Sequence, residues 1–195
     1  MEMYVYGSYH TFAHRTNVDI KNERFVVYNT KKLGSGMKEL GLHVCLNDVW
    51  NRMIDNSKKH VYTYFYIDEF HLLLHNRKIT DFLVMIWKMA RKWLGCPCGI
   101  MQNTEDLLRD DATRNILNTT SFIIMLSEEK MDRDNLQILL KLSDAQLKYI
   151  TNNAKGHGLI YTGKIVLPFE FDFPKNTKLY ALMTTSHDVK DAQFA

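Results

Sequence analysis

Two adjacent carboxylates close the most distinctive strand-like run of the sequence. Residues 61–67 are rich in β-branched and aromatic side chains, which favour a strand, and Asp68 and Glu69 follow directly. Open α/β sheets bind ligands at the carboxyl ends of their strands. There Asp68 could hold Mg²⁺, usually through water, and Glu69 could take a proton from an attacking water. A structural interpretation stays open, because any buried strand ends in something polar.

Two further polar residues could join such a site. Gln102 ends the next short strand-like run and is expected at the same sheet edge as the carboxylates. A neutral amide there can sense a terminal phosphate or orient water. Arg91 lies at the end of a helical stretch, where a cation complements the helix dipole. It could instead contact a phosphate across a subunit interface, and spacing does not choose between these roles.

Two other patterns point to different chemistry. His71 and His75 are four residues apart, but leucine follows the first histidine where the zinc motif HExxH has glutamate, so a metal site is disfavoured. Residues 158–164, GLIYTGK, have the spacing of a phosphate-binding loop. Ile165 replaces the hydroxyl residue that would bind Mg²⁺, and strand-like residues follow where a helix is required. We interpret this segment as a hairpin turn.

Strands and helices are expected to alternate along most of the chain. This pattern predicts an α/β fold with a parallel sheet and helices on its faces. A helix capped by Ser143 and Asp144 follows, and then a β-hairpin around Gly163. No internal repeat or linker is evident, so one domain over 1–195 is expected. The predicted strands are 25–29, 61–67, 99–101, 121–126 and 178–185, and the predicted helices include 34–56, 79–93 and a polar segment from 104.

The composition of the chain limits its size class, its location and its partners. The chain has 195 residues, of which 46% are hydrophobic, enough to bury a core. Its 25 basic and 22 acidic residues are mixed, so no basic stripe indicates nucleic-acid binding. Three cysteines are too few for a disulfide framework, which makes a reducing cytoplasm the expected location. No signal peptide or run of roughly 20 apolar residues is present, so membrane association would be peripheral or through a partner.

Segments along essentially the whole chain resemble the C-terminal ATPase part of the TraC-type conjugation and type IV secretion ATPases. They occur in the order that this family shows, and YIDEF, ARKW and QNTEDLL form the most specific set. The segments are TNVD, FVVYN, DVWNRM, YIDEFHLLL, ARKWLG, GIMQNTEDLL, SFIIML, KLSDAQLKYI, GHGLI and KLYALMTT.

The resemblance implies a RecA-like three-layer motor domain that uses ATP and Mg²⁺ to drive assembly of, or transport by, a secretion channel. It implies a homohexamer whose partners are other channel proteins. By the match, Asp68 is the Mg²⁺-linked Walker B aspartate and Glu69 the catalytic base. Gln102 is the glutamine of a sensor-like motif, and Arg91 is a candidate for contact with a neighbour's nucleotide.

One departure from the family pattern matters for activity. The Walker A loop of the family lies upstream of the matching residues, so the fold is expected to be truncated at its N-terminal side and inactive as this chain alone. The chain would then be a fragment of a longer protein or the product of a shortened gene. Two alternatives stay open. One is a non-catalytic ATPase-like module that binds full-length subunits or channel proteins, and the other is a small metal-dependent nuclease or phosphatase.

Overall fold

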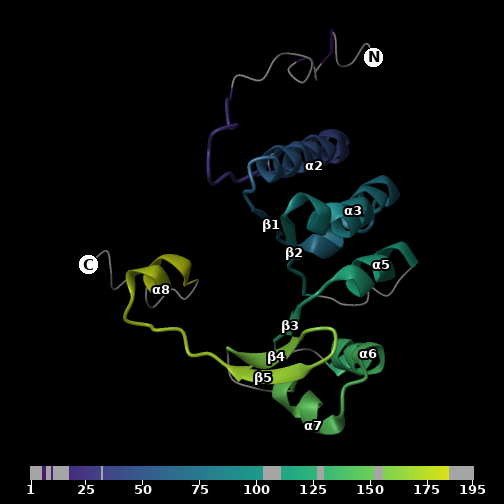
Figure 1. Ribbon diagram of the computed structural model, residues 1–195, viewed down its shortest axis with the longest axis vertical. Helices are drawn as coiled ribbons and strands as arrows, with labels where there is room; N and C mark the ends of the chain where they lie inside the picture. Colours follow the sequence, from purple (N-terminus) through teal and green to yellow (C-terminus); the bar gives the residue numbers. More distant parts are fainter. Residues whose placement is uncertain are drawn as a thin grey trace. The chain divides into compact units, whose positions relative to one another are not determined.

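The structure is a computed structural model (Figure 1). The chain forms two compact units. The first comprises Met1–Phe65 and Ala90–Cys96, and the second comprises Tyr66–Met89 and Pro97–Ala195. The prediction of a single domain over 1–195 stays a prediction. The structure describes residues 6–7, 10, 18–31, 33–102, 111–126, 130–151 and 156–184.

Helix α2 (Ser35–Ser57) dominates the first unit. Its bounds agree with the predicted range to within one residue at each end. Leu46 and Met53 are buried and seven residues apart, which places them on one face of a helix with 3.6 residues per turn. The helix follows Gly34, whose lack of a side chain leaves the first turn without a side-chain cap.

Residues 25–29, predicted as a strand, do not form one. The segment is held to α2 instead, because the Tyr28 hydroxyl donates to Asp48 Oδ2 and Arg52 donates to main-chain carbonyls just before it. Phe25 is 84% exposed. The prediction was wrong because a short run of apolar and β-branched residues indicates burial but supplies no strand neighbour. A strand also needs a neighbour for its N–H and C=O groups, and here the recorded contacts go to helical side chains.

Strands β1 (Thr63–Ile67) and β2 (Gly95–Gly99) pair with each other in parallel. Thr63 N–H donates to the Leu94 carbonyl at 3.0 Å and Ile100 N–H donates to the Ile67 carbonyl at 2.9 Å, so the partner numbers rise together. These bonds involve even-numbered residues around β2. Pro97 therefore faces away from β1, and its missing N–H removes no bond between the two strands.

The helical stretch before β2 ends at Trp93, as predicted, but Gly95 and Pro97, which are typical helix stop signals, do not end it. Helix α3 (Arg77–Ala90) continues into the 3-10 turn η3 (Arg91–Trp93), but Gly95 and the following proline lie in β2 rather than stopping the helix. The left-handed residue at the turn is Leu94, with φ 52°. Gly95 is required for packing, because a Cβ at this position would lie 2.1 Å from Met53 Sδ.

In the second unit, α3 packs against the 3-10 turn η2 (Phe70–Leu73). The Phe70 and Trp87 rings lie 5.1 Å apart, and Trp87 Nε1 donates to Thr120 Oγ1 at 3.2 Å, just after helix α5 (Asp111–Thr119). The first part of the predicted polar helix, 104–110, lies outside the described residues. The buried apolar residues of α3 recur at helical spacing, at Ile79, Leu83, Ile86, Trp87 and Ala90.

Strands β3 (Ile123–Met125), β4 (His157–Tyr161) and β5 (Val166–Glu170) form an antiparallel sheet. Helices α6 (Lys130–Leu140) and α7 (Asp144–Leu147) and the 3-10 turn η4 (Lys148–Ile150) lie beside it (Figure 1). Ser143 and Gln146 form a reciprocal capping box at the start of α7. Their shared core consists of Met125, Leu136, Leu142, Ile150 and Leu159.

The fold class predicted from the sequence is confirmed. The structure is α/β, with helices between the strands, a parallel pair and a C-terminal β-hairpin around Gly163. The last predicted strand, 178–185, was wrong where it is described, because residues 178–183 form helix α8 (Lys178–Met183). Thr177 caps this helix by accepting from the Tyr180 N–H at 3.2 Å, a local bond that favours a helix start over an extended chain.

The structure of the hairpin accounts for the two glycines of residues 158–164, so no phosphate-binding role is needed to explain them. Gly158 lies in the central strand, where a Cβ would stand 2.1 Å from the Met125 carbonyl oxygen of the neighbouring strand. Gly163 has φ +80°, in the turn between β4 and β5. Each glycine therefore meets a steric demand of the sheet, so the interpretation as a hairpin turn rather than a phosphate loop is confirmed.

Alanine substitutions are expected to distinguish the lack of space at Gly158 from the positive φ at Gly163. Gly158→Ala should lower the free energy of unfolding by about 3 kcal/mol, since the methyl group forces strands apart within the core. Gly163→Ala should cost about 1 kcal/mol, since only the left-handed backbone is penalised. Urea unfolding of both variants checks this, and equal losses would contradict the steric reason given for Gly158.

Candidate functional site

The predicted carboxylate pair lies on a bulge at the end of β1. In a regular parallel ladder, a residue that donates to residue i−1 of its neighbour accepts from residue i+1. Ile100 donates to Ile67 at 2.9 Å but accepts from the N–H of Phe70 at 2.8 Å, one residue beyond the regular partner. Asp68 and Glu69 therefore stand together opposite a single residue. Such bulges re-aim side chains and are frequent beside active sites.

Glu69 adopts an unfavourable backbone conformation within this bulge. Its φ is 49° and its ψ is 44°, in the left-handed region, which costs a residue other than glycine about 1–2 kcal/mol. Asp68 supports the turn, because its Oδ1 accepts from the Glu69 N–H at 3.0 Å. Backbone strain of this kind gathers at functional sites, where the surrounding structure holds it in place.

Two side chains flank the Glu69 carboxylate, one at each oxygen. Gln102 Nε2 donates to Glu69 Oε1 at 3.3 Å, and His71 Nδ1 lies 3.5 Å from Glu69 Oε2. Gln102 follows β2, so the contact joins the carboxyl ends of two neighbouring parallel strands. The structure thus brings together Glu69 and Gln102, whose roles stay predictions.

The residue after the carboxylates anchors the bulge to the core of the second unit. Phe70 is 2% exposed and packs on Trp87. Gly99 makes room for it, because a Cβ at residue 99 would lie 2.9 Å from the Phe70 ring. The position of the carboxylates is therefore fixed by a buried aromatic side chain as well as by main-chain hydrogen bonds.

Arg91 belongs to the first unit, whereas Asp68, Glu69 and Gln102 belong to the second. Its side chain is exposed on η3. The neighbouring Lys92 lies 5.0 Å above the Trp93 ring, which suits a cation–π contact. An exposed arginine on a short turn is compatible with both roles weighed for it, the helix-terminal one and the contact across an interface.

The predicted metal role of Asp68 rests on an exposed carboxylate. No cluster of three or more His, Cys, Asp or Glu side chains suited to a metal ion occurs in the ranges the structure describes. Mg²⁺ does not need one, because it keeps several waters and binds through one or two carboxylates plus phosphate oxygens. Asp68 fits that mode. His71 lies against Glu69, in an arrangement that the spacing of the two histidines did not suggest.

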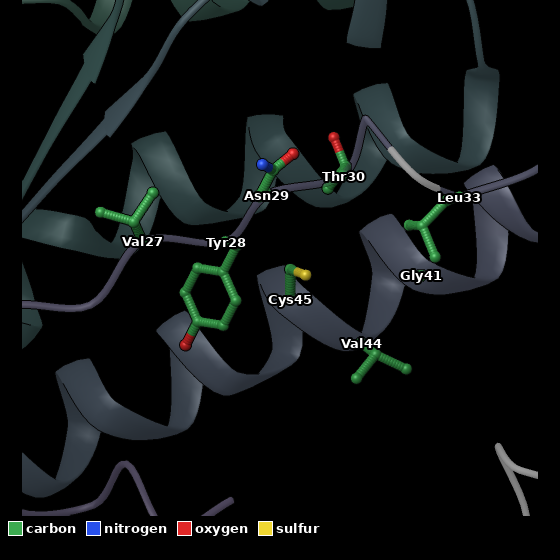
Figure 2. A pocket seen from close by; sticks show the side chains of 8 residues that line it. All are labelled: Val27, Tyr28, Asn29, Thr30, Leu33, Gly41, Val44 and Cys45. Carbon is green, nitrogen blue, oxygen red and sulfur yellow. The ribbon is translucent and has the colours of Figure 1, made fainter.

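A pocket of about 320 Å³ lies in the first unit, between the segment around Tyr28 and helix α2 (Figure 2). Burial, followed by the hydrogen bond to Asp48, raises the pKa of Tyr28, and burial raises the pKa of the Cys45 thiol. Both groups are held neutral, the reverse of an activated nucleophile. The pocket includes none of the predicted site residues. Its lining is Val27, Tyr28, Asn29, Thr30, Leu33, Gly41, Val44 and Cys45.

Sequence reasoning missed the bulge and the position of His71. The bulge depends on hydrogen bonds to Ile100, which is some 30 residues away in the chain, and no local pattern records them. The closeness of His71 to the carboxylate follows from the turn that the bulge creates. A positive φ at a glutamate has no sequence signature, since glutamate is not a residue that favours it.

Comparisons with known proteins identify a family and a similar structure. The TraG P-loop domain family matches residues 2–166. The structure is similar to VirB4 of Thermoanaerobacter pseudethanolicus, with a TM-score of 0.62 and 21% sequence identity over 76% of this chain. This chain spans 40% of the VirB4 chain. A search of curated proteins found no match.

The match to VirB4 shows a shared fold, and the family match covers most of the chain. In the described part of the chain, no helix is both long and apolar enough to cross a membrane. The chain belongs to the TraG P-loop domain family, that is, to the P-loop ATPase regions of conjugation and type IV secretion.

Proposed function

We propose that this chain is the C-terminal portion of a motor ATPase that couples ATP hydrolysis to assembly of, or transport through, a secretion channel. The observation that carries the proposal is a contact at the carboxyl ends of two parallel strands. There Gln102 Nε2 donates to Glu69 Oε1 at 3.3 Å. Ligands of open α/β sheets bind at that edge. Family membership supplies the reaction class.

Each polar residue at this edge has a distinct proposed role. Asp68 would hold Mg²⁺ through water, and Glu69 would accept the proton of the attacking water. Gln102 would sense the terminal phosphate or orient the water. Arg91 would act on the nucleotide of a neighbouring subunit. Mg²⁺, when bound, would offset the negative charge of the phosphates.

The sequence contains no GxxxxGK[ST] segment, and its one GxxxxGK spacing forms the hairpin of β4 and β5. A P-loop supplies a cradle of backbone N–H groups and a lysine that hold the phosphates. Without them, Asp68 and Glu69 can hold a phosphate only through a metal ion, and Gln102 offers a single amide as a direct donor. We therefore propose that turnover requires a phosphate-binding loop from outside the printed sequence.

The chain alone is expected to show no appreciable ATPase activity and at most weak affinity for Mg-ATP. The physical reason is the missing phosphate cradle. Isothermal titration calorimetry with Mg-ATP measures the affinity, and any residual heat should fall in Asp68→Asn but not in Glu170→Gln, a change of an exposed carboxylate on β5. Micromolar binding by the chain alone would overturn this part of the proposal.

We further propose that the intact protein acts in the cytoplasm as a hexamer, with other channel proteins as partners. The support is the family match alone. Light scattering on the protein that carries both the phosphate-binding loop and this chain measures its mass. A monomer in the presence of nucleotide would argue against Arg91 as a residue acting across an interface.

A further inference from the structure

We propose that His71 is a positioning residue for Glu69, with its Nδ1–H donating to Glu69 Oε2. His71 Nδ1 lies 3.5 Å from that oxygen, while the other carboxylate oxygen accepts from Gln102. Two donors on two oxygens fix the plane of the carboxylate. Catalytic hydrogen bonds are often long in the absence of substrate and shorten when it binds.

The burial of His71 Nδ1 supports its proposed hydrogen bond to Glu69. His71 Nδ1 is out of contact with solvent and has no hydrogen-bond partner in the described part of the chain. A buried polar atom without a partner is costly, so a small rotation of the adjacent, half-exposed Glu69 side chain toward Nδ1 is favourable. Because a carboxylate only accepts hydrogen bonds, the proton must be on Nδ1, which fixes the tautomer of the ring.

The bulge is what allows the two side chains to meet. Glu69 and His71 are two residues apart, and the left-handed backbone of Glu69 turns the chain out of the strand at this point. The ring of His71 is then held at the start of η2 beside the buried Phe70. A rigid ring on an anchored turn can orient a flexible carboxylate more readily than the reverse.

The inference deepens the proposed function, since the orientation of Glu69 matters for turnover only if Glu69 is the base. Its test does not use hydrolysis. If His71 donates to Glu69 but the intact protein does not hydrolyse ATP, the proposed function is contradicted and this inference is not. A chain without this hydrogen bond would contradict this inference whatever the protein hydrolyses.

Nuclear magnetic resonance of the chain detects this hydrogen bond from the histidine side. Long-range ¹H–¹⁵N spectra at alkaline pH, where imidazoles are neutral, show which ring nitrogen carries the proton. We expect His71 to carry it on Nδ1, and Glu69→Gly to shift it to Nε2, the usual tautomer in water. Glycine suits the positive φ of residue 69, so this variant removes the carboxylate without adding backbone strain.

Matched controls come from the same chain. His157 Nδ1 lies 3.7 Å from Glu170 Oε1 in a second histidine–glutamate pair, whose signals should not change in Glu69→Gly. The Trp87 indole N–H, bonded to Thr120, reports whether the unit remains folded. A His71 ring protonated on Nε2 in the unmodified chain, or unaffected by Glu69→Gly, would overturn the inference.

The reciprocal measurement uses His71 variants and the Gln102 side-chain amide as a reporter. His71→Phe fills the space without a donor and should shift the Gln102 amide signals, because the carboxylate is free to turn. His71→Asn places an amide N–H near the position of Nδ1 and should restore them. Unchanged Gln102 signals in a folded His71→Phe chain would show that His71 does not orient the carboxylate.

Discussion

Replacing Glu69 with glutamine is expected to lower ATP turnover by about 10²- to 10⁴-fold in a protein that joins this chain to a phosphate-binding loop. Glutamine keeps the size of the side chain and removes the basic oxygen. Its carbonyl oxygen can still accept from Gln102, so the contact between the two strand ends is retained. Binding of ATP should therefore survive the change, and the loss should appear in kcat.

Asp68→Asn is the informative companion to Glu69→Gln. It removes charge from the surroundings of the metal ion, so it should weaken Mg²⁺-dependent nucleotide binding rather than the proton transfer. Its amide oxygen can still accept from the Glu69 N–H, which preserves the local turn. The two variants are thus expected to differ in which step fails, and steady-state kinetics together with nucleotide titration separate the steps.

Controls decide whether the pair is functional or structural. Glu170→Gln changes an exposed carboxylate on the hairpin and should leave both turnover and binding unchanged. Thermal unfolding of Asp68→Asn and Glu69→Gln should resemble that of the parent. Equal losses of binding and turnover in both variants, or unfolding of both, would mean that the carboxylates only end a strand, and the base assigned to Glu69 would have to be abandoned.

Truncation of Phe70 to alanine is expected to cost about 3–5 kcal/mol of unfolding free energy. The ring is 2% exposed and fills the space that Gly99 leaves open against Trp87. Its removal creates a cavity directly beneath the bulge that carries the carboxylates. Denaturant unfolding followed by tryptophan fluorescence measures the change in free energy.

Leu72 offers a matched control within the same 3-10 turn. Half of its surface is exposed, so Leu72→Ala should change the unfolding free energy by about 0.5 kcal/mol or less. Both substitutions shorten a large apolar side chain at neighbouring positions, and only burial differs greatly. Comparable losses in the two variants would show that Phe70 does not anchor the bulge.

Local patterns in the sequence were sufficient for the elements that form from neighbouring residues. Helix α2 follows from its apolar spacing, and the start of α7 follows from the predicted cap at Ser143, whose bonds to Gln146 span three residues. The strand before Asp68 follows from its β-branched and aromatic residues. Such interactions are encoded within one or two turns of chain, so the sequence determined where these elements lie.

The sequence also predicted that Asp68, Glu69 and Gln102 lie at the carboxyl ends of neighbouring strands. Helical stretches between strands imply parallel crossovers, and parallel strands bring their carboxyl ends to one edge. That topological rule requires no knowledge of side-chain contacts. The family resemblance rested on the same residues, and the family match over 2–166 bears it out.

Only the tertiary structure decided how the edge is built. The bulge at Glu69 depends on Ile100 bonding to both Ile67 and Phe70, and the apposition of His71 follows from it. Residues 25–29 have a strand-like sequence, but Tyr28 and Arg52 tie the segment to α2. In each case the deciding partner lies 20 or more residues away in the chain, so the energy that selects the conformation is absent from any local pattern.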